Sequence, residues 1–255
     1  MPGLSMADGT PTGGVYGFVS LAIELIKKLK PDYVAVAWDK RGTNIRKRRE
    51  LYPEYKAGRK PAPDDFYQQI PILHELLDAF GWPLYEIDDY EADDIMGAFA
   101  RQAESRGIET CLITSDLDAL QLISPMTKVY AMKNGLRNIE EFTSEYFEEK
   151  YGIRTEQFLD LKALKGDSSD NLPGVPGIGE KTAVKLLQEY ETLDGVYEHL
   201  DEQKGALRTK LENGRESAYL NKQVAEIWTD APIELDRDVA AVNDCDFARV
   251  TEIMQ

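Results

Sequence analysis

Cysteine and histidine are scarce in this chain of 255 residues, which contains only Cys111, Cys245, His74 and His199. The two cysteines lie far apart and form no pairing pattern, so a disulfide framework is excluded and a reducing, cytoplasmic location is favoured. The two histidines are too few and too far apart in the chain for a zinc site. We expect His74 to pack within an amphipathic helix.

Long apolar runs are also absent. No run approaches the roughly 18 residues that a membrane-spanning helix needs. The N-terminal stretch MPGLSMADGTPTGG has neither the basic nor the apolar region of a signal peptide. We therefore expect no membrane partner, and the length favours one large domain or a large domain with a small one.

Positive charge is scarce overall, because 30 Lys and Arg face 46 Asp and Glu and leave a formal net charge of −16. Residues 40–60 are the exception, with nine Lys or Arg against two Glu and a local charge of +7. Net acidity argues weakly against a nucleic-acid partner. A basic tract of this kind is either a solvated loop or a local contact for an anion, and the excess carboxylates elsewhere can serve to hold cations.

The first part of the chain alternates apolar strands with amphipathic helices. We expect strands at 32–39, 82–87, 109–116 and 128–132, and helices at 13–30, 64–81, 90–107 and 118–123. This alternation predicts an α/β domain over residues 1–142, with a parallel sheet and helices on both faces. From residue 143 the pattern is all helical, with helices at 143–152, 155–166, 180–190, 192–200 and 215–228. It predicts a separate helical region over residues 143–255.

Acidic residues follow three of the expected strands. They are Asp39, Glu91, Asp93, Asp94, Asp116 and Asp118. Functional groups in such sheets gather at the carboxyl ends of the strands. Like charges tolerate this proximity only when a cation neutralises them. Oxygen ligands suit Mg²⁺ or Mn²⁺, and two such ions can assist a phosphoryl displacement. The alternative is structural, because acids at helix starts also cap the helix and complement its dipole.

The stretch NLPGVPGIGEKTAVKLL, between two helical segments, predicts a turn that binds an anion. Gly177 and Gly179 allow a tight turn with outward N–H groups, and the next helix adds a favourable dipole. Lys181 and Thr182 lie in the first turn of that helix, where they can contact the same anion. The whole string resembles the helix-hairpin-helix element, which binds the DNA backbone without reading base sequence.

Several motifs together resemble one family. They are Asp39, the basic tract ending in YPEYKAGR, YEADD, TSDLD and GDSSDNLPGVPGIGEKTA, in that order. The same order occurs in the structure-specific 5′ nucleases, which include the flap endonucleases and the 5′ nuclease domain of bacterial DNA polymerase I. The resemblance runs from about residue 15 to residue 230. It implies a PIN-like α/β fold and a helical region with a helix-hairpin-helix (helix-three-turn-helix) element.

The resemblance implies hydrolysis of phosphodiesters at the 5′ ends of DNA, including flaps and RNA primers, with two Mg²⁺ or Mn²⁺ ions, in replication and repair. The implied ligands of one metal are Asp39, Glu91 and Asp93, and those of the second are Asp116, Asp118, Asp167 and Asp170, with Asp94 in support. In the basic tract, Lys56 and Arg59 would act on the scissile phosphate, Tyr55 could stack on a base, and either Arg46 or Arg48 would contact phosphate. The hairpin turn of the family often holds K⁺, and a polymerase domain can belong to the same longer chain.

One departure affects the expected activity. Members of the family begin with a strand that ends in a metal-site aspartate, and the segment before residue 13 does not match it. We expect that strand to be absent from the middle of the sheet, which would leave its neighbours unpaired. Two other functions stay open: a DNA-binding fragment with weak or no catalysis, and a PIN-type ribonuclease, although the hairpin and the basic tract disfavour the ribonuclease.

Overall fold

The structure is a computed structural model that describes residues 4–6, 9–133, 138–242 and 245–253, and the statements below concern those residues. The α-helices are α1 (Gly13–Leu29), α2 (Arg46–Leu51), α3 (Asp64–Ala79), α4 (Ala92–Ser105), α5 (Ser144–Tyr151), α6 (Phe158–Lys165), α7 (Glu180–Tyr190), α8 (Leu193–Glu198), α9 (Gly205–Ala225), α10 (Arg237–Ala240) and α11 (Phe247–Ile253). The short 3-10 helices are η1 (Leu117–Leu122), η2 (Thr155–Gln157) and η3 (Leu200–Glu202). The strands are β1 (Val36–Ala37), β2 (Leu84–Tyr85), β3 (Thr110–Thr114), β4 (Thr127–Lys133) and β5 (Asn138–Phe142).

The strands form two small sheets. In the first, β1 pairs with β2 in parallel, and in the second β3 pairs with β4 in parallel. The expected parallel α/β architecture is therefore confirmed. In the described chain the two sheets share no strand pairing, and α4 packs against both β1 and β3. Because β1 and β2 span only two residues each, they are shorter than the apolar runs predicted.

Several elements differ from the sequence expectation, which included no helix at the positions of α2, α10 or α11. Strand β5 pairs antiparallel with β4 and was not predicted. Helix α9 begins at Gly205, ten residues before the predicted start at 215. The segment 205–214 contains two glycines and many polar residues, so its local pattern is weakly helical. Packing against α6 stabilises it as helix instead.

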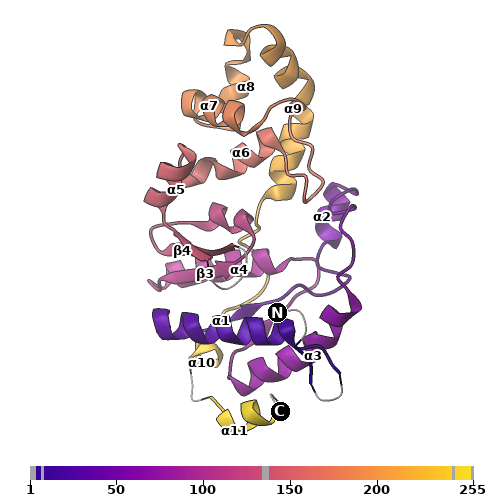
Figure 1. The fold of residues 1–255 in the computed structure, drawn as a ribbon. Coiled ribbons are helices and arrows are strands. Elements are labelled where there is room, and N and C mark those ends of the chain that lie inside the picture. Colours follow the sequence, from indigo (N-terminus) through magenta and orange to yellow (C-terminus); the bar gives the residue numbers. More distant parts are fainter. Residues whose placement is uncertain (1–3, 7–8, 134–137, 243–244, 254–255) are drawn as a thin grey trace.

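The helical part stacks on the α/β part, and the chain returns to the α/β part after α9 (Figure 1). Residues 226–235 run along α4, where Gln102 bonds to the Ile233 carbonyl at 2.8 Å and to the Leu235 N–H at 2.9 Å. Further on, α11 packs against α3. Helices α10 and α11 therefore lie with the first half of the fold, although they follow the helical region in the chain.

One apolar core continues from β3 and β4 through α5 and α6 into α7, α8 and α9. Phe142, Phe147, Leu161 and Leu164 are fully buried in it. This shared core fixes the loop after α6 against the sheet, and that loop carries the GDSSD motif. No helix in the described residues is long and apolar enough to cross a membrane.

Candidate active site

The acidic cluster begins at the N-terminus of α4. Glu91 and Asp94 form a reciprocal cap there, in which the Glu91 N–H donates to Asp94 Oδ2 at 2.8 Å. Asp39, which follows β1, accepts a hydrogen bond from the Ala92 N–H at 2.8 Å. Three carboxylates therefore meet at one helix end, where the helix dipole favours negative charge.

Asp93 lies on the first turn of the same helix and is repelled by its neighbours. Burial, together with the charges of Asp116 and Glu91, raises the pKa of Asp93 to about 8. Asp39 adds a weaker repulsion. Asp116 is held in place as the cap of η1, because its Oδ1 accepts from the Asp118 N–H at 3.0 Å. The acids after three different segments are thus close enough to affect one another's ionisation.

Lys162, on α6, lies between two further acids, Asp118 and Asp167. Its side chain is only 3% exposed, it contacts Asp118, and its Nζ lies 3.0 Å from Asp167. Burial raises the pKa of Asp118 to about 6, although the charge of Lys162 opposes this rise. Burial also acts against the ionised form of Asp167, but hydrogen bonds from Ser169 and the charge of Lys162 lower its pKa to about 2.

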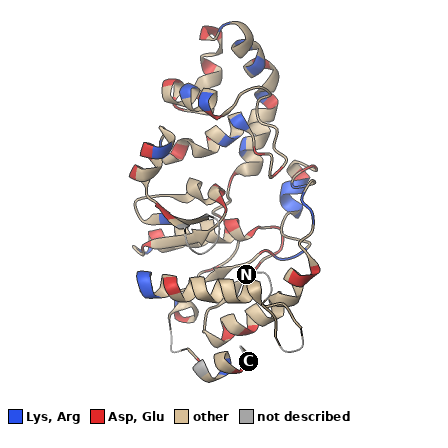
Figure 2. Ribbon diagram, in the orientation of Figure 1, with Lys and Arg blue, Asp and Glu red and all other residues tan. Residues whose placement is uncertain are grey.

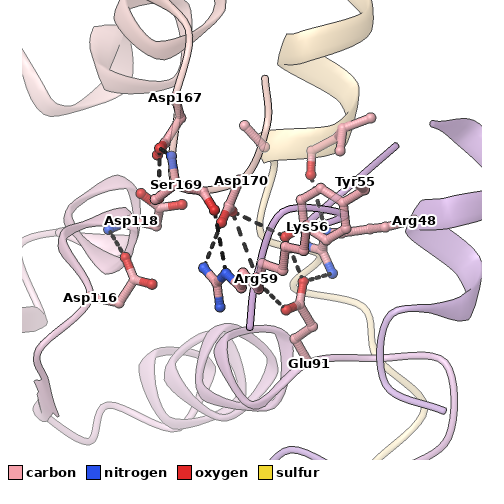
Figure 3. Close-up of polar contacts among 12 residues, drawn as sticks. Arg48, Tyr55, Lys56, Arg59, Glu91, Asp116, Asp118, Asp167, Ser169 and Asp170 are labelled. Carbon is pink, nitrogen blue, oxygen red and sulfur yellow. Dashed lines mark hydrogen bonds and ion pairs between the residues drawn. The ribbon is translucent and has the colours of Figure 1, made fainter. Parts of the chain in front are cut away.

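The loop after α6 brings Asp170 into contact with the basic tract. The buried Tyr55 hydroxyl lies 2.8 Å from Glu91 Oε2 and 3.2 Å from Asp170 Oδ2. Arg59 donates to Asp170 Oδ1 at 2.6 Å, and the Lys56 ammonium contacts Glu91 (Figure 3). The Lys56 N–H also donates to the Asp170 carbonyl at 3.1 Å. Three distant segments therefore meet around Glu91 and Asp170.

The basic tract divides into buried and exposed side chains. Arg48 and Tyr55 are each 3% exposed, whereas Arg46 lies at the surface and pairs with Asp89 at 2.6 Å. Arg48 pairs with Asp94, and the Tyr55 ring packs among Leu172, Val224 and Ala225. In this conformation Arg46 is the arginine of the two that can reach a phosphate, and the face of the Tyr55 ring is covered by protein.

The predicted hairpin lies away from these acids, in the helical part. Gly177 adopts a φ of +81°, which favours glycine, and both it and Gly179 are exposed. A Cβ added at Gly179 would meet no atom within 4 Å, so the backbone there is open to close approach. Gly179 caps α7 with no side-chain partner, and Lys181 is exposed and Thr182 half-buried beyond it.

The oxygen-rich cluster suits divalent cations in its chemistry. The mutual repulsion of Asp93, Asp116 and Glu91 is what a divalent cation would relieve, and carboxylates are the ligands that Mg²⁺ and Mn²⁺ prefer. Among the described residues, no three acidic, histidine or cysteine side chains already form a ready cage for one ion. Asp94 accepts hydrogen bonds from Arg48 and from the Glu91 N–H. Its carboxylate is therefore already occupied, and it holds Glu91 in position.

The fold is that of the 5′-exonucleases and flap endonucleases. A mutant of the T5 5′-exonuclease matches with a TM-score of 0.69 and 24% identity, over 96% of this chain and 92% of that structure. The bacteriophage T5 flap endonuclease in a complex with DNA and metal ions matches with a TM-score of 0.73 and 22% identity, over 96% and 90%. The catalytic core of Rad2 with DNA substrate matches with a TM-score of 0.64 and 19% identity, over 98% and 81%.

The family is shown by sequence. The model of the 5′-3′ exonuclease N-terminal resolvase-like domain matches residues 1–152, and that of the 5′-3′ exonuclease C-terminal SAM fold matches residues 153–248. The chain belongs to the 5′-3′ exonuclease family. DNA polymerase I of Caldicellulosiruptor bescii is 42% identical over 100% of this chain and 30% of its own length. That of Bacillus subtilis is 42% identical over 92% and 27%. The chain therefore spans less than a third of these relatives.

Proposed function

We propose that this chain hydrolyses phosphodiesters at the 5′ ends of DNA, including 5′ flaps and RNA primers, in replication and repair. The observation that carries the proposal is the bridge by Tyr55 between Glu91 and Asp170. It joins the basic tract, the α4 acids and the GDSSD loop into one site, in a member of the 5′-3′ exonuclease family. We place the activity in the cytoplasm, on a chain that can also carry a polymerase domain.

The acids would hold two Mg²⁺ or Mn²⁺ ions. Asp39, Glu91 and Asp93 would hold one ion. The residues for the second are Asp116, Asp118, Asp167 and Asp170. When bound, the ions would lower the pKa of a water and stabilise the attacking and leaving oxygens. The raised pKa of Asp93 and its dependence on Asp116 support a shared site, because charges that interact this strongly lie close together.

The cations at the edge of the site would bind the substrate. Lys56 and Arg59 contact Glu91 and Asp170, so their charges already lie beside the acids and could stabilise a phosphate there. Exposed Arg46 would contact a second phosphate, and the buried Tyr55 ring would stack on a base only after the basic tract moved. Figure 2 shows that Lys and Arg residues cluster on α2.

The hairpin would bind the DNA backbone away from the cut. The open backbone at Gly179 and the dipole of α7 favour a phosphate, and Lys181 and Thr182 lie in the adjoining turn. A K⁺ ion at the turn stays a prediction. The carbonyl of Gly177 accepts a hydrogen bond from Lys210 at 3.0 Å, so one oxygen of the turn already faces a cation.

Cleavage of an end-labelled 5′-flap DNA, with Mg²⁺ and with chelator, tests the proposal. We expect metal-dependent cutting near the flap junction, at least about a hundredfold slower in Asp116→Asn, with DNA binding retained. Asn is also a good helix cap, so the η1 turn should survive the change. Asp64→Asn, at the exposed start of α3, is the charge-matched control and should cut normally.

Other outcomes identify the alternatives. Cutting that persists in chelator would overturn the metal assignment. Salt-sensitive binding without cutting would identify a DNA-binding fragment, and preference for single-stranded RNA would identify a PIN-type ribonuclease.

A further inference from the structure

Helix α9 packs against the hairpin through three residues on one face of the helix. Lys210, Gly214 and Ser217 are spaced four and three residues apart, so they share one face of the helix. Ser217 donates to the Gly174 carbonyl at 2.8 Å. A Cβ added at Gly214 would lie 2.6 Å from Val175 Cγ1, so only glycine lets the helix approach this closely.

Lys210 is the residue of this face that contacts the turn at Gly177. Its Nζ donates to the Gly177 carbonyl at 3.0 Å. Its aliphatic stem covers Gly177, because a Cβ added there would lie 2.9 Å from Lys210 Cε. Lys210 therefore covers the side of Gly177 that glycine would leave open, whereas the backbone of Gly179 remains open.

The charge of Lys210 is not neutralised by an acid in the described part of the chain. Lys165 and Lys222, on neighbouring helices, are instead paired with Glu180 and Asp160. Lys210 is exposed, and its ammonium has three N–H groups, of which one is directed at the Gly177 carbonyl. Two donors and a full positive charge remain at the turn, two residues before Gly179.

The first N–H groups of α7 also favour an anion. Within the described residues, the N–H groups of Gly179, Glu180 and Lys181 donate to no protein acceptor. An anion held by these amides would lie beside the turn that carries the Lys210 ammonium, and a lysine contact of this kind adds a charge-assisted hydrogen bond.

We propose that Lys210 contacts the DNA backbone phosphate bound at the hairpin, while its bond to Gly177 holds the turn in shape. The inference rests on the proposed function, because it assumes that the hairpin binds DNA. It adds α9, whose Lys210 lies 33 residues after Gly177 in the chain, to the binding surface.

The test is the salt dependence of binding to a fluorescent 5′-flap DNA, measured by anisotropy in chelator with the full chain. Lys210→Met keeps the stem over Gly177 and removes the charge. We expect it to weaken binding about 3- to 10-fold near 0.1 M salt and to reduce the slope of log K against log[salt] by about 1. Lys210→Arg should restore most of the slope. Lys27→Met, at an exposed position of α1, removes the same charge elsewhere and should leave the slope unchanged.

The outcomes separate this inference from the function on which it rests. A wild-type chain that shows no salt-sensitive binding would refute DNA binding at the hairpin altogether. Wild-type binding with an unchanged slope in Lys210→Met would refute the phosphate contact alone, even if affinity fell, because a lysine that only shapes the turn releases no counterions. If Lys210→Met lost its cooperative thermal transition, Lys210→Gln, which retains a donor without charge, would give the same comparison.

Discussion

Arg48 and Asp94 form a buried, two-pronged ion pair, with Nη1–Oδ2 and Nη2–Oδ1 distances of 2.6 and 2.7 Å. The guanidinium also donates to the carbonyls of Val224 at 3.1 Å and Glu226 at 2.7 Å, and its Cζ lies 4.1 Å from the Trp228 ring centroid. The pair thus connects the basic tract, the start of α4 and the end of α9. It lies next to Glu91, whose Oε2 is 3.2 Å from Arg48 Nη1.

Replacing Arg48 should therefore destabilise the fold around the acidic cluster. Arg48→Met leaves the Asp94 charge buried without its partner, and we expect a loss of roughly 3–5 kcal/mol in the free energy of unfolding. Arg46→Met is the matched control, because Arg46 is exposed and surface pairs contribute roughly 0–1 kcal/mol. Urea unfolding measures both changes. A loss below about 1 kcal/mol for Arg48→Met would show that the pair does not hold these segments together.

The loop that carries Asp167 and Asp170 depends on two glycines pressed against each other. Gly174 adopts a φ of +64°, and a Cβ there would lie 2.3 Å from the Gly166 backbone nitrogen. We expect Gly174→Ala to destabilise the chain by roughly 2–4 kcal/mol and to displace the loop.

Gly58→Ala, where a Cβ would meet nothing within 4 Å, should change stability by less than about 0.5 kcal/mol. Thermal unfolding and the protection of the loop amides from hydrogen exchange measure the effect. Equal behaviour of the two variants would mean that the loop can relax without this contact.

The acids could be found from the sequence because they follow apolar strands, and the topology of a parallel sheet brings strand ends together. The hairpin could be found because its glycines and prolines define the turn locally. Both predictions depend on short-range patterns. The division of the described strands into two sheets depends on pairing between distant segments, which no local pattern of residues reports.

Lys162, β5 and the start of α9 could not be found in this way. Lys162 lies in an ordinary helical stretch, and its position between Asp118 and Asp167 depends on how α6 packs on η1. Likewise, nothing local separates Arg48 from Arg46, since both belong to one basic run. Their contrast arises because one side of a short helix faces α4 and α9, and the other faces solvent.

Lys162 should be needed to hold its two carboxylates together. Lys162→Met removes a buried cation between half-buried acids, and we expect a loss of roughly 1–3 kcal/mol at pH 7 in chelator. The lowered pKa of Asp167, about 2, contributes stability above the ordinary value of 3.8 that is lost as the pH falls toward 2. The gap in unfolding free energy between wild type and variant should therefore narrow twice as the pH falls, first toward about pH 6 as Asp118 takes up a proton, and again below about pH 4 as Asp167 does.

Lys165→Met, which breaks a more exposed pair with Glu180, is the control and should lose less than about 1 kcal/mol. Urea unfolding at pH values from 7 down to about 2 measures the free energy of unfolding of both variants. A gap for Lys162→Met that stays constant with pH would show that the lysine acts by packing and not by its charge.

Asp93 should destabilise the metal-free chain at high pH. Its folded pKa of about 8 lies above the ordinary 3.8, so between these values the folded state binds more protons than the unfolded state. Stability from this group is therefore full below about pH 4 and is lost as the pH rises through 8. Asp93→Asn removes the charge, and its gain over wild type should grow with pH, reaching on the order of 1 kcal/mol or more at pH 8.

The measurement is thermal unfolding in chelator from pH 4 to pH 9, with Asp64→Asn as an exposed control that changes the net charge equally. The control should show no gain that grows over this range. Added Mg²⁺ should stabilise wild type more than Asp93→Asn, because the ion would relieve a repulsion that the variant has already lost. A gain that is the same at every pH, or greater stability of wild type at pH 8, would refute the repulsion among Asp93, Asp116 and Glu91 and with it the electrostatic argument for a shared metal site.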